Sequence, residues 1–384
     1  MCGPRCFDAW SRLLALADRP ADDAAGVSRR DFLAASAATV FAAAGSAAAA
    51  SSAEATRAVL EATLSFDLHS HPGLFQSTSN DTLAGHRQSA EAGRVKLIAL
   101  TATSDAPVLS RDRRGALRAF RQPKPGELHT SMYRQLDALR KWSAAVGMPT
   151  VSGVADAATP GPPVRGLFAV EGCDFLEGRV DRVQEAFDRG IRSLQLVHYR
   201  VNELGDIQTE APVHGGLTAF GTDAVREMNR LGIVVDVAHA TEAVVRRVTE
   251  TTTQPIILSH SNIQDLSGWA RFISPEHARL VAGTGGVIGA MPIFLGHRGE
   301  DIDAYVTHIA RLVDAVGIDH VALGTDMDGI GPGAIFTSYA RWPSLAAALL
   351  DRGYRPDEVG KILGGNAQRV FRRVGGPAKT SRAR

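Results

Sequence analysis

The stretch that decides the fold is Phe66-Asp67-Leu68-His69-Ser70-His71, an apolar run that ends in two histidines. Four more apolar runs end at or beside a residue that can bind a metal ion, namely Glu171, His239, His260 and Asp326. Each run has the length and composition of a buried β-strand. In a (β/α)₈ barrel the tips of such strands converge on one face, where catalytic residues come from several strands.

Strand-like runs alternate with helical patterns from Ser65 onward. We expect eight strands: Ser65–His71, Val95–Thr101, Arg165–Glu171, Ile191–His198, Gly232–His239, Pro255–His260, Gly285–Pro292 and His320–Asp326. Amphipathic stretches between them predict helices, including Thr222–Leu231, Glu276–Ala282, Ile302–Val316 and Ser344–Arg352. This alternation indicates a parallel sheet covered by helices, and eight repeats favour a closed barrel over an open sheet. We therefore predict an α/β fold, a (β/α)₈ TIM-type barrel of the metal-dependent hydrolase (amidohydrolase-like) kind.

The longest connection joins the second and third predicted strands. We expect a helix at Tyr133–Val146 and a loop at the Pro/Gly-rich stretch Thr159–Pro163. Neither an internal repeat nor a second folded domain is evident in the sequence. We therefore assign residues 51–384 to a single (β/α)₈ metallohydrolase domain.

The first 50 residues have a different character. Ser28-Arg29-Arg30-Asp31-Phe32-Leu33 precedes a run of small apolar residues from Ala34 to Ala50. A twin arginine, then Phe-Leu, then a mildly apolar segment resembles a twin-arginine export signal. The alternative is a chance Arg-Arg pair before an Ala-rich helix. We assign residues 1–50 to a twin-arginine export signal with a small-residue leader, and expect an exported, periplasmic protein.

The composition is that of a soluble globular protein, with 45% hydrophobic and 22% charged residues among 384. A formal net charge of +1 gives no reason to expect a nucleic acid or an anionic membrane as partner. No internal apolar run reaches the roughly 18 to 20 residues of a spanning helix, so we expect no stable membrane span in the mature form. Cys173 is the one cysteine beyond the leader, which excludes an internal disulfide.

Five residues at the strand tips have the chemistry of a two-metal site. His69 and His71 are two apart, so in a strand they face the same side and can bind one ion. Glu171 can bridge two divalent ions that lie ~3.5 to 4 Å apart, and His239 with His260 would bind the second. Imidazole with carboxylate suits Zn²⁺ best, with Mn²⁺, Co²⁺ or Fe²⁺ as alternatives. The pattern predicts a two-metal hydrolase.

Three further residues are candidates for catalysis or substrate binding. Asp326 is the first acid at the end of the eighth predicted strand and can move a proton between a water and a leaving amine. Asp328 faces the same side by strand alternation and is the reserve. His198 is either a third metal ligand or a donor to the substrate oxyanion, and we favour the donor because both metal sites already have protein ligands. Arg271, in the loop after His260, can bind a substrate carboxylate with two hydrogen bonds.

These residues resemble the membrane dipeptidase (renal dipeptidase) family of binuclear zinc peptidases, peptidase family M19, and in particular exported bacterial members. The resemblance extends from about Phe66 to Phe371. Its most specific stretches are Gly216-Leu217-Thr218-Ala219-Phe220-Gly221, Val225–Gly232, Asp236–His239, Ser259-His260-Ser261 and Gly364-Gly365-Asn366.

The resemblance implies a role for each candidate. His69 and the residue two later bind the first zinc, Glu171 bridges, and His239 and His260 bind the second. His198 polarises the scissile or oxyanion oxygen, Arg271 holds the substrate's C-terminal carboxylate, and Asp326 shuttles the proton. One departure stands out: the family usually has His-x-Asp on the first strand, whereas this chain has His71. Imidazole is a competent ligand, but the change removes one negative charge, which weakens metal affinity or alters metal preference.

We therefore expect a binuclear metal-dependent dipeptidase that acts through a metal-bridging water and accepts a D-residue at the C-terminal position. Two alternatives remain: a metal-dependent amidase, lactamase or lactonase acting on a non-peptide, and a non-catalytic metal-binding protein of the envelope. The presence of Glu171, His198, Arg271 and Asp326 together favours an enzyme. Its partner is a small-molecule dipeptide, and a homodimer is suggested by the resemblance alone.

Overall fold

The computed structural model describes residues 52–72, 80–113, 115–157, 164–294, 299–330 and 333–375. Within the chain, Ser52–Arg384 forms one compact unit. The predicted leader, residues 1–50, and the predicted loop Thr159–Pro163 lie outside the described residues, so both stay predictions.

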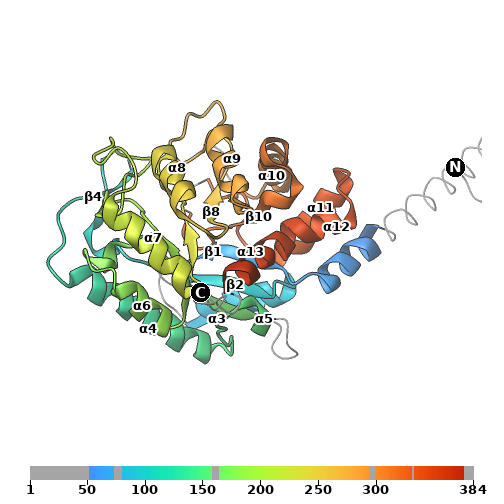
Figure 1. The fold of residues 1–384 in the computed structure, drawn as a ribbon. Coiled ribbons are helices and arrows are strands. Elements are labelled where there is room, and N and C mark those ends of the chain that lie inside the picture. Colours follow the sequence, from blue (N-terminus) through green and yellow to red (C-terminus); the bar gives the residue numbers. More distant parts are fainter. Residues whose placement is uncertain are drawn as a thin grey trace, which may run out of the picture. The chain divides into compact units, whose positions relative to one another are not determined.

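Eight parallel strands close into a barrel in the order β1-β10-β9-β8-β7-β6-β5-β2. Their bounds are β1 Phe66–Ser70, β2 Leu97–Thr103, β5 Arg165–Glu171, β6 Ile191–Gln195, β7 Val234–Asp236, β8 Ile257–Ser261, β9 Val287–Ala290 and β10 Val321–Leu323. Successive barrel strands are neighbours in the sheet, and helices lie outside them (Figure 1). This arrangement confirms the predicted (β/α)₈ fold.

All eight predicted strands are present, and Arg165–Glu171 has the predicted bounds. Most of the others end sooner than the sequence predicts. His198, His239 and Asp326 therefore lie in the loops after β6, β7 and β10, and the prediction that these strands extend to them is wrong. Backbone conformation explains two of the three, because φ is 66° at His239 and 48° at Asp326. These values belong to the left-handed region, which does not continue a strand.

The helices cover the barrel from outside. They are α3 Asn80–Ala92, α4 Glu127–Ala145, α5 Val154–Ala157, α6 Arg182–Asp188, α7 Ala219–Leu231, α8 Glu242–Thr251, α9 Pro275–Gly283, α10 Ile302–Val316, α11 Trp342–Asp351, α12 Pro356–Gly360 and α13 Asn366–Gly375. All five predicted helices are among them, and α10 has the predicted bounds. Among the described residues, no helix is long and apolar enough to cross a bilayer.

Side-chain caps explain where several of these helices begin. The residue before each one accepts a hydrogen bond from a backbone N–H of the first turn, satisfying a donor that has no partner within the helix. These capping residues are Thr218, Thr241, Ser274 and Asp301. Local hydrogen bonds therefore define where these helices begin, although the connections that precede them differ in length, from five residues before α8 to 23 before α7.

The sequence did not predict an antiparallel hairpin between β2 and α4. It consists of β3 Leu109–Arg111 and β4 Leu117–Ala119. Its strands have three residues each, too short for a periodic pattern to identify. The hairpin follows the C-terminal tip of β2, so it belongs to the face of the barrel that carries the polar strand tips.

A buried carboxylate ties the first strand to the last. Asp67, on β1, accepts hydrogen bonds from the Thr325 backbone N–H at 2.8 Å, from the Thr325 hydroxyl at 2.6 Å and from the Tyr339 hydroxyl. Burial raises the pKa of Asp67, while these hydrogen bonds favour the charged form. The network holds the residues just before Asp326 against the strand that carries His69.

Glycines allow β8, β9 and β10 to approach one another closely. A Cβ on Gly289 or Gly324 would lie 1.8 or 1.7 Å from the carbonyl oxygen of Ser259. No side chain can occupy that space without moving backbone. The glycine after β10 is therefore required by packing at the tip of β8, beside His260.

We predict that Gly324→Ala lowers the free energy of unfolding by about 3 kcal/mol or more, because the added methyl overlaps backbone that cannot move aside. Urea denaturation measures the change. Gly153→Ala is the control, because its added methyl would meet no atom within 4 Å. Equal denaturation midpoints for the two variants would contradict this account of the barrel.

Candidate metal centre

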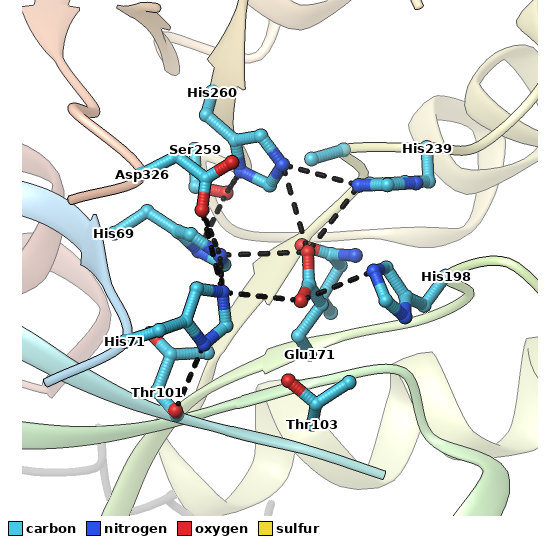
Figure 2. Close-up of polar contacts among 12 residues, drawn as sticks. His69, His71, Thr101, Thr103, Glu171, His198, His239, Ser259, His260 and Asp326 are labelled. Atoms are coloured by element: carbon cyan, nitrogen blue, oxygen red, sulfur yellow. Dashed lines mark hydrogen bonds and ion pairs between the residues drawn. The ribbon is translucent and has the colours of Figure 1, made fainter. Parts of the chain in front are cut away.

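The two histidines of the first strand meet the carboxylate of β5. Their Nε2 atoms lie 3.0 Å apart. His69 Nε2 is 3.4 Å from Glu171 Oε1, and His71 Nε2 is 3.3 Å from Glu171 Oε2 (Figure 2). The three side chains form one set of ligand atoms within 4.8 Å of one another.

A second set shares the same carboxylate. His239 Nε2 and His260 Nε2 lie 3.1 Å apart. They are 3.3 Å and 3.6 Å from Glu171 Oε1. In Figure 2 both imidazoles lie above the Glu171 carboxylate. Among the described residues, these two sets are the groups whose donor atoms could hold a metal ion, and they contain all five predicted ligands.

The donor chemistry of both sets fits divalent ions. Four imidazoles point their Nε2 atoms at one carboxylate, and none of these five side chains is more than 3% exposed. Nitrogen atoms that approach this closely in a buried space repel each other unless a proton or a cation lies between them. Burial lowers the pKa of His239 and of His260 well below the ordinary value, which favours the neutral form that binds metals.

Glu171 is held as a carboxylate. Burial alone would raise its pKa, but the charges of His198 and His69 and hydrogen bonds from His239 and His69 outweigh burial, so the pKa lies well below the ordinary value. A carboxylate whose charged form is favoured in this way, at the centre of five imidazoles, can share two cations.

Ser259 supports one histidine from each set. Its Oγ lies 2.9 Å from His260 Nδ1 and 3.4 Å from His69 Nδ1. A hydroxyl oxygen has two lone pairs and one hydrogen. It can therefore accept hydrogen bonds from both Nδ1–H groups while it donates its own hydrogen to Asp236. Burial raises the pKa of Asp236, and this hydrogen bond acts in the opposite direction. With Nδ1 protonated, each imidazole presents an Nε2 lone pair to its metal site.

The other two imidazoles are held differently. His71 Nδ1 lies 3.2 Å from the Thr101 carbonyl oxygen, which accepts its proton. His239 Nδ1 is buried without a hydrogen-bond partner among the described residues. The outer support of the cluster is therefore uneven, and Ser259 is the residue that serves both sets.

Asp326 lies beside the first set. Its Oδ1 is 3.4 Å from His71 Nε2 and 3.9 Å from His69 Nε2. Burial raises its pKa above the ordinary value. Asp328, the reserve candidate, instead contacts His86 Nδ1 at 3.1 Å. The expectation that Asp328 faces the same side by strand alternation is wrong, because the chain has left β10 and φ is positive at both acids.

His198 has a carboxylate partner that the sequence did not reveal. Its Nδ1 is 2.7 Å from Asp105 Oδ1, and its Nε2 is 3.2 Å from Glu171 Oε2. The other Asp105 oxygen accepts the Tyr199 backbone N–H at 3.1 Å. Burial lowers the pKa of His198, but Asp105 and Glu171 more than offset it and raise that pKa to about 9. Asp105 follows β2, and the predicted end of that strand at Thr101 was too early to mark it as a strand-tip acid.

Arg271 is buried at the wall of the same site. It is 2% exposed and donates to Gln208 Oε1 at 2.5 Å and to the His260 carbonyl oxygen at 3.4 Å. Burial lowers its pKa, while Tyr199 and Glu171 act in the opposite direction. Gln208 and Tyr199 were not predicted, because they lie in a long loop without a periodic pattern.

The candidate residues open into one cavity of about 530 Å³. His71, Glu171, His198, His239, His260, Arg271 and Asp326 all line it. Apolar wall is provided by Trp269, Met291 and Ile293. His69, whose side chain is 2% exposed, and the reserve candidate Asp328 are absent from this lining. The volume suits a small molecule of dipeptide size.

Solved structures share this fold. An amidohydrolase from Pseudomonas aeruginosa superposes with a TM-score of 0.69 at 20% identity, covering 84% of this chain and 99% of that one. A metallo peptidase from Rhodobacter sphaeroides, liganded with a phosphinate mimic of L-Ala-D-Ala, superposes with a TM-score of 0.66 at 18% identity, covering 81% and 99%. At such identities the likeness shows the fold alone, which is the (β/α)₈ barrel described above.

Sequence comparison identifies the family. Residues 133–384 match the membrane dipeptidase family (peptidase family M19), and the chain belongs to that family. Dipeptidase tcpJ of Claviceps purpurea is 34% identical over 217 residues, and dipeptidase aclJ of Aspergillus oryzae is 31% identical over 216. Each alignment covers 54% of this chain and 50% or 51% of the relative. The chain thus spans about half the length of the curated relatives it matches, and these two are fungal.

We predict that Ser259→Ala weakens metal binding at both sites by roughly 10- to 100-fold, because two buried Nδ1–H groups lose their acceptor. Competition with a chromophoric chelator measures both affinities. Ser65→Ala is the control, since Ser65 is a buried serine at the start of β1 whose hydroxyl bonds the Arg94 carbonyl. Weakening of one site only, or of neither, would show that Ser259 does not link the two sets.

We predict that Asp105→Asn destabilises the metal-free protein in a pH-dependent way. The pKa of His198 is raised to about 9, so the stabilisation is fully present below the ordinary pKa near 6.5 and is lost as pH rises through about 9. Urea denaturation of chelator-treated protein should give the largest difference from wild type below pH 6.5. A difference that stays constant up to pH 10 would exclude this charge interaction.

Proposed function

We propose that this protein is a binuclear metal-dependent dipeptidase. The observation that carries the proposal is the pair of three-donor sets that share Glu171 in a cavity walled by Arg271 and Asp326. Membership of the membrane dipeptidase family and the dipeptidase names of the fungal relatives support it. Fold, family and donor geometry thus agree on hydrolysis of a peptide bond in a small substrate.

We infer that the cluster holds two divalent ions, with zinc as the metal that imidazole and carboxylate ligands favour. His69 and His71 would hold one ion, His239 and His260 the other, and Glu171 both. When bound, such ions polarise a carbonyl and lower the pKa of water to near neutrality. The distances among the five side chains support this assignment, since one carboxylate lies within 3.6 Å of all four Nε2 atoms.

Asp326 is positioned to move the proton. Its carboxylate borders both the cavity and the first set of ligands. Because burial raises its pKa, Asp326 accepts a proton more readily than an exposed aspartate does. It can therefore take a proton from the attacking water and give it to the nitrogen of the scissile bond. The second residue then leaves with a free amino group.

His198 and Arg271 orient the substrate. Asp105 holds His198 Nδ1, so that Nε2 faces the cavity, where it can donate to the oxygen that gains charge during hydrolysis. Arg271, buried but lining the cavity, can pair with the C-terminal carboxylate. We propose that a D-residue at the C-terminal position is accepted, because these contacts fix the carboxylate and carbonyl without requiring one hand at the α-carbon.

The test is metal analysis and hydrolysis of L-L, L-D and D-D dipeptides by the purified protein. We expect about two ions per chain and turnover that a chelator removes and added metal restores. Asp326→Asn should lower kcat by roughly 10²- to 10⁴-fold without loss of metal, because only the proton transfer is removed. Asp328→Asn, on the same loop but directed at His86, is the matched control and should stay within a few-fold of wild type.

Each result separates the candidate functions. Two ions with no dipeptide turnover, but with hydrolysis of cyclic amides or lactones, would move the function to an amidase, lactamase or lactonase. Two ions with no turnover of any of these substrates would favour a non-catalytic metal-binding protein. A chain that holds no tightly bound metal would refute the two-metal assignment.

A further inference from the structure

The β3–β4 hairpin forms part of the wall of the catalytic cavity. Arg111, Leu117 and Arg118 line the same 530 Å³ space as Glu171 and Asp326. The hairpin thus brings two guanidinium groups to a cavity that already contains the buried Arg271. The proposed reaction does not use either of these hairpin arginines.

Arg118 fastens the hairpin. Its guanidinium bonds Glu210 Oε1 at 2.6 Å and Asp112 Oδ2 at 3.2 Å. Glu210 follows Thr209, which also lines the cavity. The ion pairs therefore connect the hairpin to the loop after β6, and two carboxylates balance the charge of Arg118.

Arg111 differs from Arg118 in having no acidic partner among the residues that the structure describes. Its guanidinium donates to the Gly115 carbonyl oxygen at 2.9 Å and forms no ion pair with a described residue. The side chain is exposed to solvent at the cavity wall. Arg111 therefore presents an uncompensated positive charge, already restrained by one backbone hydrogen bond.

The described residues that line the cavity include few carboxylates that could pair with a positively charged substrate group. Among the described lining residues, the carboxylates are Glu171 and Asp326, and both lie at the metal cluster. Away from the cluster, the charged groups of the described wall are arginines. A substrate group that extends toward the hairpin consequently meets positive potential, which attracts an anion and disfavours an ammonium.

We propose that Arg111 determines specificity for substrates that carry a negative charge on the amino side of the scissile bond, such as a dipeptide whose first residue is glutamate. This inference rests on the proposed dipeptidase function, in which Arg271 holds the C-terminal carboxylate. A guanidinium pairs with a carboxylate through two parallel hydrogen bonds, so the side-chain carboxylate at the first residue is the group that fits Arg111.

The experiment compares Glu-Ala with Gln-Ala, two dipeptides of nearly equal shape that differ by one charge. With metal-loaded wild-type protein, we expect kcat/KM for Glu-Ala to exceed that for Gln-Ala by roughly tenfold, mainly through a lower KM. One charge-assisted hydrogen-bonded contact at a partly exposed site contributes a factor of about this size. Because salt screens exposed charges, the ratio should shrink as ionic strength rises.

Two arginine variants test the assignment. Arg111→Gln should bring the Glu-Ala to Gln-Ala ratio close to one. Arg113→Gln is the matched control, because Arg113 is an exposed arginine of the same hairpin that does not line the cavity, and it should leave the ratio unchanged. Circular dichroism and metal content confirm that each variant is folded and loaded, which is expected for changes at exposed positions.

The outcomes for this inference and for the proposed function differ. Hydrolysis of both dipeptides at equal kcat/KM, or a preference for Glu-Ala that survives Arg111→Gln, would overturn the role of Arg111 and leave the dipeptidase intact. A preference lost equally in Arg113→Gln would point to general charge rather than to this contact. Absence of turnover with every dipeptide would refute the proposed function, and this inference with it.

Discussion

One buried carboxylate organises this protein. Glu171 lies within hydrogen-bonding or ion-pairing distance of five imidazoles that come from four other strands of the barrel or the loops that follow them (Figure 2). Those imidazoles belong to His69, His71, His198, His239 and His260. To bury an uncompensated charge among them would cost several kcal/mol, so the cluster is stable only with cations or protons to balance it. The parallel barrel is the geometry that brings so many separate strand ends to one carboxylate.

Three more buried acids support that arrangement from outside. Asp67 lies within β1, Asp236 ends β7 and Asp105 follows β2, and each accepts a backbone N–H from another strand or from the segment after one. The acceptor joins β1 to the segment after β10, β2 to the segment after β6, and β7 to β8. The acids therefore link neighbouring strands and the loops after them through side-chain hydrogen bonds, in addition to the backbone hydrogen bonds of the sheet. Asp105 contacts the His198 imidazole and Asp67 accepts the His69 backbone N–H, so these contacts also restrain residues of the candidate site.

The sequence predicts this protein well where a residue's role follows from its place in a strand, and poorly where the chain turns. The eight strands, and the five side chains that the structure gathers as candidate ligands, follow from apolar runs that end in histidine or glutamate. Asp328 was misjudged because strand alternation does not hold once φ becomes positive. Asp105 and Arg111 could not be found from the pattern, since the first acts through a histidine distant in sequence and the second lies in a hairpin of two three-residue strands.

The left-handed backbone at His239 and Asp326 lowers the stability of the fold in order to place two side chains of the candidate site. A side chain in that region costs roughly 1 to 2 kcal/mol relative to an unstrained residue, and glycine avoids the cost. Directed evolution for heat resistance alone would thus be drawn toward glycine at these two positions and would discard a candidate ligand and a candidate acid. The barrel could become more robust while losing the groups at its mouth, so thermostability is an unsafe guide to engineering this scaffold unless the site is scored at the same time.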